Sequence, residues 1–181
     1  MRITGGDLRS RRLLTIKSSG LRPATDRLRE SMFDILCNLV DFHGTTALDL
    51  YAGTGSVGFE AISRGASRVV FVESNHKVAG VLRENASTLG VAGACGIYMM
   101  KVENFLKVCT EKFDIVYVDP PYSFNKTTHE IVDRIMERGI VKGSGVLCVE
   151  HSRDYSPPPT KLFRQKEFGS TILSFIKLEK K

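Results

Sequence analysis

The fold of this sequence is decided by the stretch Asp49-Leu50-Tyr51-Ala52-Gly53-Thr54-Gly55-Ser56-Val57-Gly58. It overlaps an apolar run at 47–51 and leads into an apolar pattern of helical period over 57–64. Glycines between a strand and a helix let the backbone turn tightly and approach a ligand at the helix N-terminus. The stretch contains G-x-G-x-x-G, and Glu73 follows Gly53 by twenty residues. An acid at that spacing accepts hydrogen bonds from ribose hydroxyls, so the pattern predicts a nucleotide-binding turn.

Short apolar, β-rich runs alternate with helical patterns along the rest of the chain. The predicted strands are 47–51, 68–73, 96–101, 113–119 and 145–151, and the predicted helices are 25–40, 57–64, 75–89, 103–110 and 127–138. A terminal hairpin is expected to pair 161–168 with 171–178 around Gly169 and Ser170. This alternation predicts an α/β fold with a mostly parallel, twisted sheet covered by helices on both faces. Ligands bind beyond the carboxyl ends of the strands in such folds, so chemistry is expected there.

Asp49 bears on which cofactor the glycine turn holds. A carboxylate just before the turn would repel a pyrophosphate, but it would suit the ammonium group of S-adenosylmethionine (SAM). An NAD(P)-binding oxidoreductase is the alternative, and it is supported only by the glycines and Glu73. The 181 residues leave little sequence for the further substrate domain that a dehydrogenase needs.

A second motif, Asp119-Pro120-Pro121-Tyr122, ends the strand predicted at 113–119. An exocyclic amine on a nucleobase is a poor nucleophile because its lone pair is delocalised into the ring. Hydrogen bonds from that amine to the Asp119 carboxylate and the Pro120 carbonyl would favour a pyramidal nitrogen. Pro121 has no N–H to compete for these acceptors, and Tyr122 would stack on a base swung out of its helix. The motif therefore predicts chemistry on a nucleobase amine.

The positive charge of the chain is concentrated at its N-terminus. The chain has 26 Lys+Arg against 20 Asp+Glu, a net charge of +6. Residues 1–29 hold eight basic and two acidic residues, which accounts for the whole surplus. Most of these basic residues are arginines, whose guanidinium groups suit bidentate contacts with phosphate. We predict a basic N-terminal arm at 1–24 and a catalytic domain at 25–181. The arm is either a solvated surface segment or, if the rest of the chain acts on a nucleic acid, a polyanion-binding segment. In the second case the nucleic-acid contacts would come from Arg2, Arg9, Arg11, Arg12, Arg22, Arg27 and Arg29.

Several classes of protein are excluded by composition. The chain has no run of roughly 18 to 20 uninterrupted apolar residues, which a membrane helix needs. The start MRITGGDLRSRRLL lacks the apolar core of a secretion signal. Cys37, Cys95, Cys109 and Cys148 have neither C-x-x-C spacing nor a histidine at zinc-finger spacing, so we expect neither a metal site nor a disulfide framework. The expectation is a cytoplasmic protein, acting as a monomer, with free thiols.

The motifs also resemble a known family. DLYAGTGSVGFEAISRGA together with DPPY resembles the class I SAM-dependent methyltransferases that modify exocyclic amines of nucleobases. RITGGDLRSRRL and LRPATDRLRESMFDIL resemble, more narrowly, the RsmD family of bacterial 16S rRNA guanine-N2 methyltransferases, over essentially the whole chain. The resemblance implies a Rossmann-like fold, SAM as cofactor, and methylation of the N2 amine of a guanine. The partner implied is 16S rRNA, either naked or in a partly assembled small ribosomal subunit.

The resemblance implies roles for individual residues as well. Glu73 would hold the ribose of SAM, and the cofactor-binding set would be Asp49, Tyr51, Ala52, Gly53, Thr54, Gly55, Glu73, Ser74, Val102 and Glu103. The catalytic set would be Asp119, Pro120, Pro121 and Tyr122. The family's N-terminal signature, which lies over the cofactor and substrate cleft, is matched by Arg22, Pro23, Thr25 and Arg29.

Lys101 departs from the family pattern. After the third strand the family has Asp or Asn, whose side chain holds the adenine amino group, and lysine cannot accept that hydrogen bond. Three explanations are open: Glu103 takes the place of the missing Asp or Asn, the backbone around Val102 binds the adenine, or the match to the family pattern is shifted by a residue or two. Two other functions stay open from the residues alone. One is methylation of another exocyclic amine, such as N6 of adenine in rRNA or DNA, and the other is a non-catalytic RNA-binding module.

Overall fold

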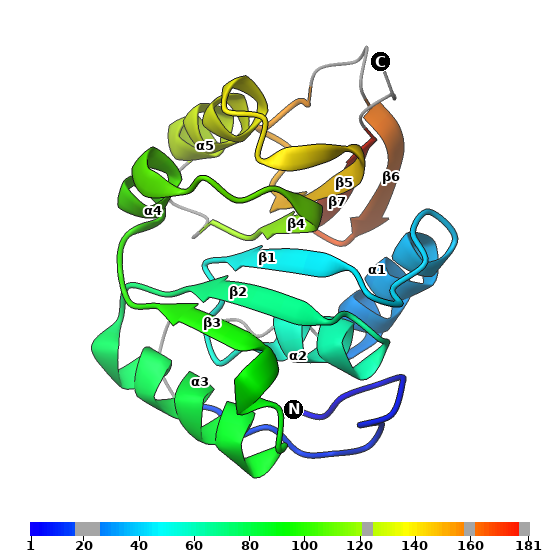
Figure 1. Ribbon diagram of the computed structural model, residues 1–181. Coiled ribbons are helices and arrows are strands. Elements are labelled where there is room, and N and C mark those ends of the chain that lie inside the picture. The colour runs from blue at the N-terminus through cyan, green and yellow to red at the C-terminus, as the bar shows by residue number, and fades with distance from the viewer. Residues whose placement is uncertain (17–25, 121–124, 158–161, 178–181) are drawn as a thin grey trace.

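The computed structural model describes residues 1–16, 26–120, 125–157 and 162–177. Its centre is a seven-stranded sheet (Figure 1) with the strand order β3-β2-β1-β4-β5-β7-β6. The strands are β1 (Thr46–Leu50), β2 (Arg68–Val72), β3 (Cys95–Tyr98), β4 (Phe113–Val118), β5 (Val141–His151), β6 (Leu162–Phe168) and β7 (Thr171–Lys177). The first five strands run parallel to one another, whereas β7 is antiparallel to both β5 and β6. The predicted parallel sheet with a terminal hairpin is confirmed.

Helices cover both faces of the sheet. On one face, α1 (Asp26–Cys37), α2 (Ser56–Ser63) and α3 (His76–Thr88) contribute to one apolar cluster with β1, β2 and β4. On the other face, α4 (Val102–Val108) and α5 (Asn125–Glu137) contribute to a second apolar cluster. Figure 1 shows α4 and α5 on the opposite side of the strands from α2 and α3. A short 3-10 turn, Ala92–Ala94, leads into β3. Strands buried on both faces explain why their sequences are almost continuously apolar.

The largest differences from the predicted boundaries, three or more residues, occur at β5, β3 and α1. β5 begins at Val141 rather than 145, because Gly143 and Gly145 weaken the strand signal in the sequence. At Gly145 the structure requires glycine, since a Cβ there would lie 2.7 Å from the backbone oxygen of Asp114. β3 ends at Tyr98 instead of 101. α1 ends at Cys37, and the next residues form a turn in which the Val40 N–H donates to the Leu36 carbonyl.

The N-terminal segment 1–16 packs against the helices rather than standing apart. Arg2 and Arg12 form an antiparallel bridge, and Ile3 and Leu13 are buried in the cluster that contains α1. In Figure 1 this segment runs beside α2 and α3. The division into an arm at 1–24 and a domain at 25–181 stays a prediction, with residues 17–24 outside the described ranges.

In the part of the chain that the structure describes, no helix has both the length and the apolarity to cross a membrane.

Candidate active site at the strand ends

The carboxyl ends of β1, β4 and β5 bring three acidic side chains together. Asp49 on β1 pairs in register with Tyr117 on β4, and Tyr117 pairs with Cys148 on β5. Two residues further on, β4 leads into Asp119 and β5 reaches Glu150. Residues in register in a parallel sheet face the same side, and side chains alternate along each strand. The three carboxyl groups therefore lie on one face of the sheet, the face that α1, α2 and α3 cover.

The turn after β1 uses each glycine for a different reason. Gly53 and Gly55 have positive φ values of 57° and 90°, which L side chains rarely adopt. A Cβ on Gly55 would also lie 2.3 Å from the Leu82 side chain, whereas the space above Gly53 is open within 4 Å. Gly58 lets α2 approach β2, because a Cβ there would lie 2.1 Å from the Phe71 ring. The turn thus exposes backbone at Gly53 while the helix behind it packs tightly.

Glu73 joins this turn to the end of β2. Its Oε2 accepts a hydrogen bond from the Gly53 N–H at 3.0 Å, and its Oε1 accepts one from the Asn75 N–H at 2.7 Å. Each carboxylate oxygen can accept a further hydrogen bond, so Glu73 can still bind the hydroxyls of a ribose. Ser74 beside it is exposed to solvent. The spacing of twenty residues read from the sequence is a direct contact in the structure.

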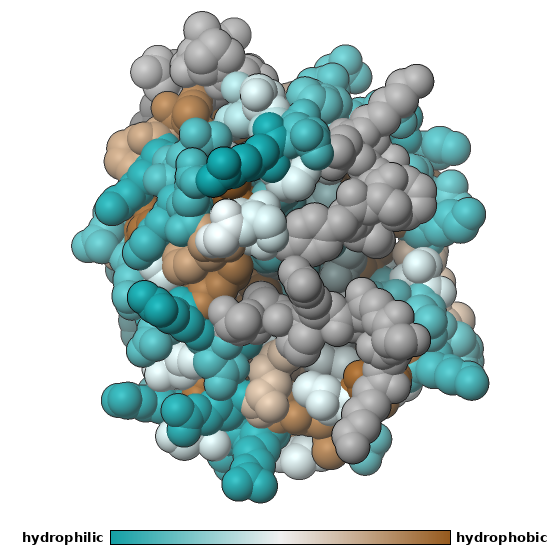
Figure 2. All heavy atoms as spheres, turned by 180° about the vertical axis from the view of Figure 1, so that it is seen from behind, coloured by the Kyte–Doolittle hydropathy of each residue, from teal (hydrophilic) through white to brown (hydrophobic). Residues whose placement is uncertain are grey.

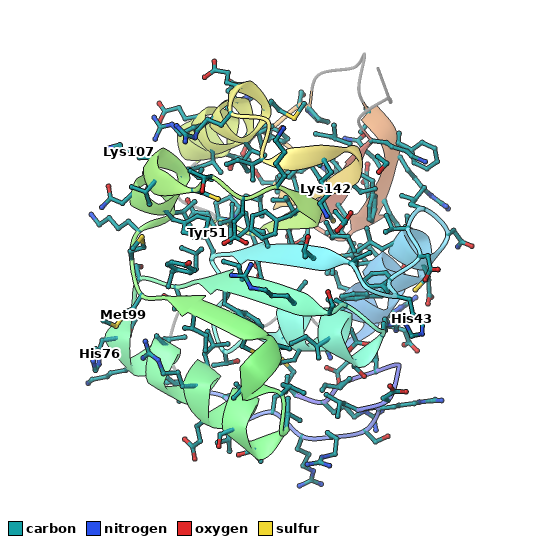
Figure 3. The ribbon with its side chains drawn as sticks, in the orientation of Figure 1. His43, Tyr51, His76, Met99, Lys107 and Lys142 are labelled. Carbon is teal, nitrogen blue, oxygen red and sulfur yellow. The ribbon has the colours of Figure 1, made fainter. Side chains whose placement is uncertain are left out.

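Tyr51 occupies a strained position at the end of β1. Its φ of 62° lies in the left-handed region, which is costly for a residue with a side chain. Figure 3 shows the ring at the carboxyl end of β1, where it packs against the apolar cluster of α4 and α5. Its hydroxyl is buried and has no hydrogen-bond partner among the described residues. Burial, and then the negative charge of the nearby Glu103, raise the pKa of Tyr51.

The start of α4 places the residues predicted to hold adenine. Lys101 precedes the helix in an extended conformation, with φ −65° and ψ 143°, and its side chain is exposed. Val102 is buried, and Glu103 is partly buried. Of these neighbours, Glu103 is the acidic group whose charge acts on Tyr51.

The two other predicted cofactor-binding residues lie in the turn after β1. Ala52 is buried under this turn, and the Thr54 carbonyl accepts a hydrogen bond from Asn85 at 3.0 Å.

Asp119 and Pro120 follow β4 beside the glycine turn, because β4 is the neighbour of β1 in the sheet. Asp119 is partly buried and Pro120 is buried. Burial first, and then the negative charges of Glu150 and Asp49, raise the pKa of Asp119 well above its ordinary value. Pro121 and Tyr122, the rest of the predicted catalytic motif, lie outside the described residues.

Glu150 was missed by the sequence analysis. It lies within β5 and is buried, with 6% of its surface exposed, and its Oε2 accepts a hydrogen bond from the Tyr117 hydroxyl at 2.6 Å. Burial raises the pKa of Glu150, and the Tyr117 hydrogen bond acts in the opposite direction. The available signal was a charged residue in the apolar run 145–151, which would have been significant once β5 was placed beside β4.

Asp49 is the most deeply buried acid of the three, with 2% of its surface exposed. Its Oδ2 accepts a hydrogen bond from the Gly58 N–H at 2.9 Å. Burial raises the pKa of Asp49 to about 7, the Gly58 hydrogen bond opposes this, and the Glu73 charge adds to it. A buried carboxyl group with a raised pKa is stabilised in its charged form by a positively charged ligand, so Asp49 favours such a ligand.

The predicted RNA-binding arginines divide into two groups. Arg2, Arg9, Arg11, Arg12 and Arg27 are exposed, and Arg22 lies outside the described residues. Hydrophilic side chains project along the lower edge of the molecule in Figure 2, the end where Figure 1 shows the N-terminus. Arg29 requires a correction, because its side chain is fully buried and pairs with Asp26 at 2.9 Å and Glu60 at 3.4 Å. Arg29 therefore has a structural position and does not reach the surface.

The strand order, the glycine turn after β1 and the acid at the end of β2 define a class I methyltransferase fold. A solved RNA methyltransferase from Salinibacter ruber, in complex with S-adenosyl-L-homocysteine, shares this fold with a TM-score of 0.66 at 15% identity, over 88% of this chain and 95% of the other. Within that class, the family model described as "Conserved hypothetical protein 95" matches residues 1–177, and the chain belongs to this family.

Two relatives agree with that assignment. Ribosomal RNA small subunit methyltransferase D of Haemophilus influenzae is 35% identical over 179 residues, covering 93% of this chain and 89% of the relative. The solved structure of the putative methyltransferase yhhF from Escherichia coli has a TM-score of 0.88 at 30% identity, covering 100% of this chain and 99% of the other. The resemblance to the RsmD family inferred from the sequence is confirmed.

Proposed function

We propose that this protein transfers the methyl group of SAM to the exocyclic N2 amine of a guanine in 16S rRNA. The observation that carries the proposal is the position of Asp119 and Pro120 at the end of β4, directly beside the glycine turn that ends β1. A base amine held by these two acceptors would lie next to a cofactor held by the turn. The names of the relatives support small-subunit ribosomal RNA as the acceptor.

The residues around the turn fit SAM. Asp49 offers a buried carboxyl group for a cation, Glu73 has free acceptor sites for ribose hydroxyls, and the open space over Gly53 admits a ligand close to the backbone. The buried, unpartnered hydroxyl of Tyr51 offers a further polar contact. When bound, SAM supplies a methyl group already activated by the positive charge on sulfur.

Adenine recognition falls to the start of α4. Lys101 is exposed and has no acceptor, so it does not replace the Asp or Asn of the family pattern. We assign the adenine amino group to Glu103 or to the backbone at Val102, because the charge of Glu103 acts on Tyr51 at the edge of the site.

The protein contributes position and lone-pair orientation to the reaction. The Asp119 carboxylate and the Pro120 carbonyl accept the two amine hydrogens, which favours a pyramidal nitrogen with its lone pair directed at the methyl group. No strong base is required, since the amine becomes acidic once it carries the methyl group. Tyr122 is assigned to stacking on the extruded guanine, at a typical contribution of about 1–3 kcal/mol per base.

The exposed arginines of the N-terminal segment are assigned to the RNA backbone. Arg2, Arg9, Arg11 and Arg12 all lie in the described segment 1–16 and carry exposed side chains. Arginine binds phosphate through two parallel N–H donors, which fixes orientation without reading sequence. These contacts would position the RNA while the motif at β4 selects the base.

Radiolabelled SAM tests the proposal directly. The full chain is incubated with naked 16S rRNA, small ribosomal subunits and DNA, and the labelled nucleosides are identified after digestion. N2-methylguanosine in 16S rRNA is the expected product. N6-methyladenosine, or label in DNA, would move the activity to another amine. Stabilisation of the protein by NADH but not by SAM in thermal unfolding would favour an oxidoreductase. RNA binding without transfer, unaffected by Asp119→Ala, would indicate a non-catalytic module.

A further inference from the structure

Among the described residues, the three acids at the strand ends have no cationic partner. The ion pairs of that part of the chain join other groups, and none includes Asp49, Asp119 or Glu150. Within it, the Gly58 N–H donates a hydrogen bond to Asp49, and the Tyr117 hydroxyl donates one to Glu150. Burying carboxylates without a positive partner is costly, so this arrangement favours protonation of the acids or binding of a cation.

The groups that face Asp119 from neighbouring strands reinforce this effect. They are Asp49 on β1, Tyr117 on its own strand, and Cys148 and Glu150 on β5, while Glu73 at the end of β2 acts on Asp49. None of them is basic. Asp119 and Glu150 follow the paired residues Val118 and Val149, so they stand side by side.

This arrangement bears on the role that Asp119 has in the proposed reaction. To orient an amine, Asp119 must accept a hydrogen bond from it, and a charged carboxylate is a stronger acceptor than a protonated carboxyl group, which keeps only its carbonyl oxygen for this purpose. Burial and the two neighbouring acids favour the protonated form in the cofactor-free protein by raising the pKa of Asp119. A positive charge that enters the site would favour the charged form and so make Asp119 the stronger acceptor.

We propose that Asp119 and Glu150 form a carboxyl pair that holds a proton in the cofactor-free protein, releases it when the sulfonium of SAM binds, and takes up the proton of the methylated amine. This rests on the proposed function, since it requires SAM and an amine acceptor. Cofactor binding thereby strengthens recognition of the base, because the deprotonated pair is the stronger acceptor for the amine hydrogen. Glu150 is a positioning residue that acts through Asp119.

The cycle balances in atoms and charge. Binding of the sulfonium cation sends one proton from the pair to solvent. In the transfer, the bond from the methyl carbon to nitrogen forms, the bond from carbon to sulfur breaks, and its electron pair stays on sulfur as the thioether. The methylated nitrogen, now positively charged, gives its proton to the pair. The pair ends protonated as it began, and one proton per methyl group has reached the solvent.

Calorimetric titration counts the released protons without requiring turnover. The full chain is titrated near pH 7 with SAM, in buffers of different ionisation enthalpy, and separately with S-adenosyl-L-homocysteine (SAH). SAH is the matched ligand because it keeps the ammonium group and lacks the sulfonium charge. We expect SAM to release about half to one proton more than SAH. As pH rises toward the pKa of the pair, the ratio of SAM affinity to SAH affinity should increase, at most about tenfold per pH unit.

Two variants connect this excess to the pair. Glu150→Gln removes the charge beside Asp119 and keeps an oxygen for the Tyr117 hydroxyl, so the excess proton release should fall by at least about half and the pH dependence should flatten. Asp114→Asn is the matched control, because Asp114 is at the other end of β4 and pairs with Lys142 at 2.7 Å. It should leave the excess unchanged.

Tyr117→Phe is the second variant, and it is expected to strengthen proton binding by the pair where Glu150→Gln weakens it. It removes the hydroxyl that stabilises charged Glu150, so the rise of the SAM-to-SAH affinity ratio should move to higher pH. Equal proton release with SAM and SAH in the unmodified protein would overturn the inference while leaving methyl transfer intact. Failure of SAM to bind at all would overturn the proposed function itself, and the inference with it.

Discussion

Two sets of buried carboxyl groups in this protein are treated in opposite ways. Glu60 on α2 is fully buried, and its oxygens accept hydrogen bonds from the backbone N–H groups of Thr4 and Gly5 and from the Thr4 hydroxyl, each at 2.8 Å. Arg29 and Arg64 add positive charge at 3.4 Å and 3.0 Å. The fold thus supplies Glu60 with donors and cations from three separate segments.

The acids at the strand ends, Asp49, Asp119 and Glu150, have fewer hydrogen-bond donors and no cation around them among the described residues. In the part of the chain that the structure describes, Asp49 and Glu150 each accept one hydrogen bond, and the charges that act on Asp119 are those of other acids. Burial alone therefore does not define a functional carboxylate. A buried acid whose charge is matched by the fold is a structural element, whereas one left without a cation marks a place where a charged ligand is expected.

Asp119→Ala is the strongest test of the acids at the strand ends. Methyl transfer to 16S rRNA should fall by at least about 10³-fold, because the amine loses the acceptor that orients its lone pair in a positioned site. SAH affinity should change less than about threefold, since SAH lacks the sulfonium and its other contacts lie at the glycine turn. Incorporation of label and calorimetry give the two values. Asp114→Asn is the control, and full activity of the Asp119 variant would remove this residue from the reaction.

Glu60→Ala tests the structural role of the carboxyl group whose charge the fold matches. Removing the carboxylate leaves Arg29 buried with one partner fewer and detaches Thr4 and Gly5 from α2, so the free energy of unfolding should drop by about 3–5 kcal/mol. Urea denaturation measures the loss, and proteolysis within 1–16 should accelerate. Glu150→Gln, by contrast, should be neutral or stabilising. If both variants destabilised the protein equally, the distinction between the two sets would fail.

Stability as a function of pH distinguishes the sets further. The pKa of Asp49 is about 7 in the folded protein against an ordinary value of 3.8, so between these values the folded state binds a proton that the unfolded state has released. The free energy of unfolding should therefore fall as pH rises from about 4 to 7, by roughly 2–4 kcal/mol from this group. Asp49→Asn keeps an oxygen for the Gly58 N–H and should lack this component. Urea midpoints across the pH range, compared between the two proteins, measure it, and parallel curves would contradict the expectation.

The smallest effect is expected on the outer face of the N-terminal segment. Replacing Arg9, Arg11 and Arg12 with alanine should weaken RNA binding and lower the salt dependence of the binding constant by about 2–3 in the log–log slope. Exposed Lys107 and Lys112, near α4, provide a control pair. An unchanged slope would show that the three arginines face away from RNA. The inner face of the same segment, held by Glu60, should be unaffected.

Much of the fold could be predicted because its signals are local. Apolar runs, helical periods and the glycine turn each extend over about ten residues, and the structure confirms the parallel sheet and the hairpin after them. The boundaries failed where glycines weakened the signal, as at Gly143 and Gly145. Roles for Pro121, Tyr122 and Arg22 stay predictions, as does the base that is methylated.

The order of strands and helices, the turn that needs glycine, and the acid twenty residues beyond it can be read from the amino-acid sequence, because backbone conformation and periodicity depend on neighbouring residues. The pairing of buried charges is visible only in the folded chain. The sequence suggests that Arg29 contacts RNA, but in the structure it is buried and pairs with Glu60, 31 positions away. Glu150 becomes a candidate site residue only because β5 lies beside β4. The free energy of a buried charge depends on what surrounds it in space, and residues distant in the chain supply those surroundings.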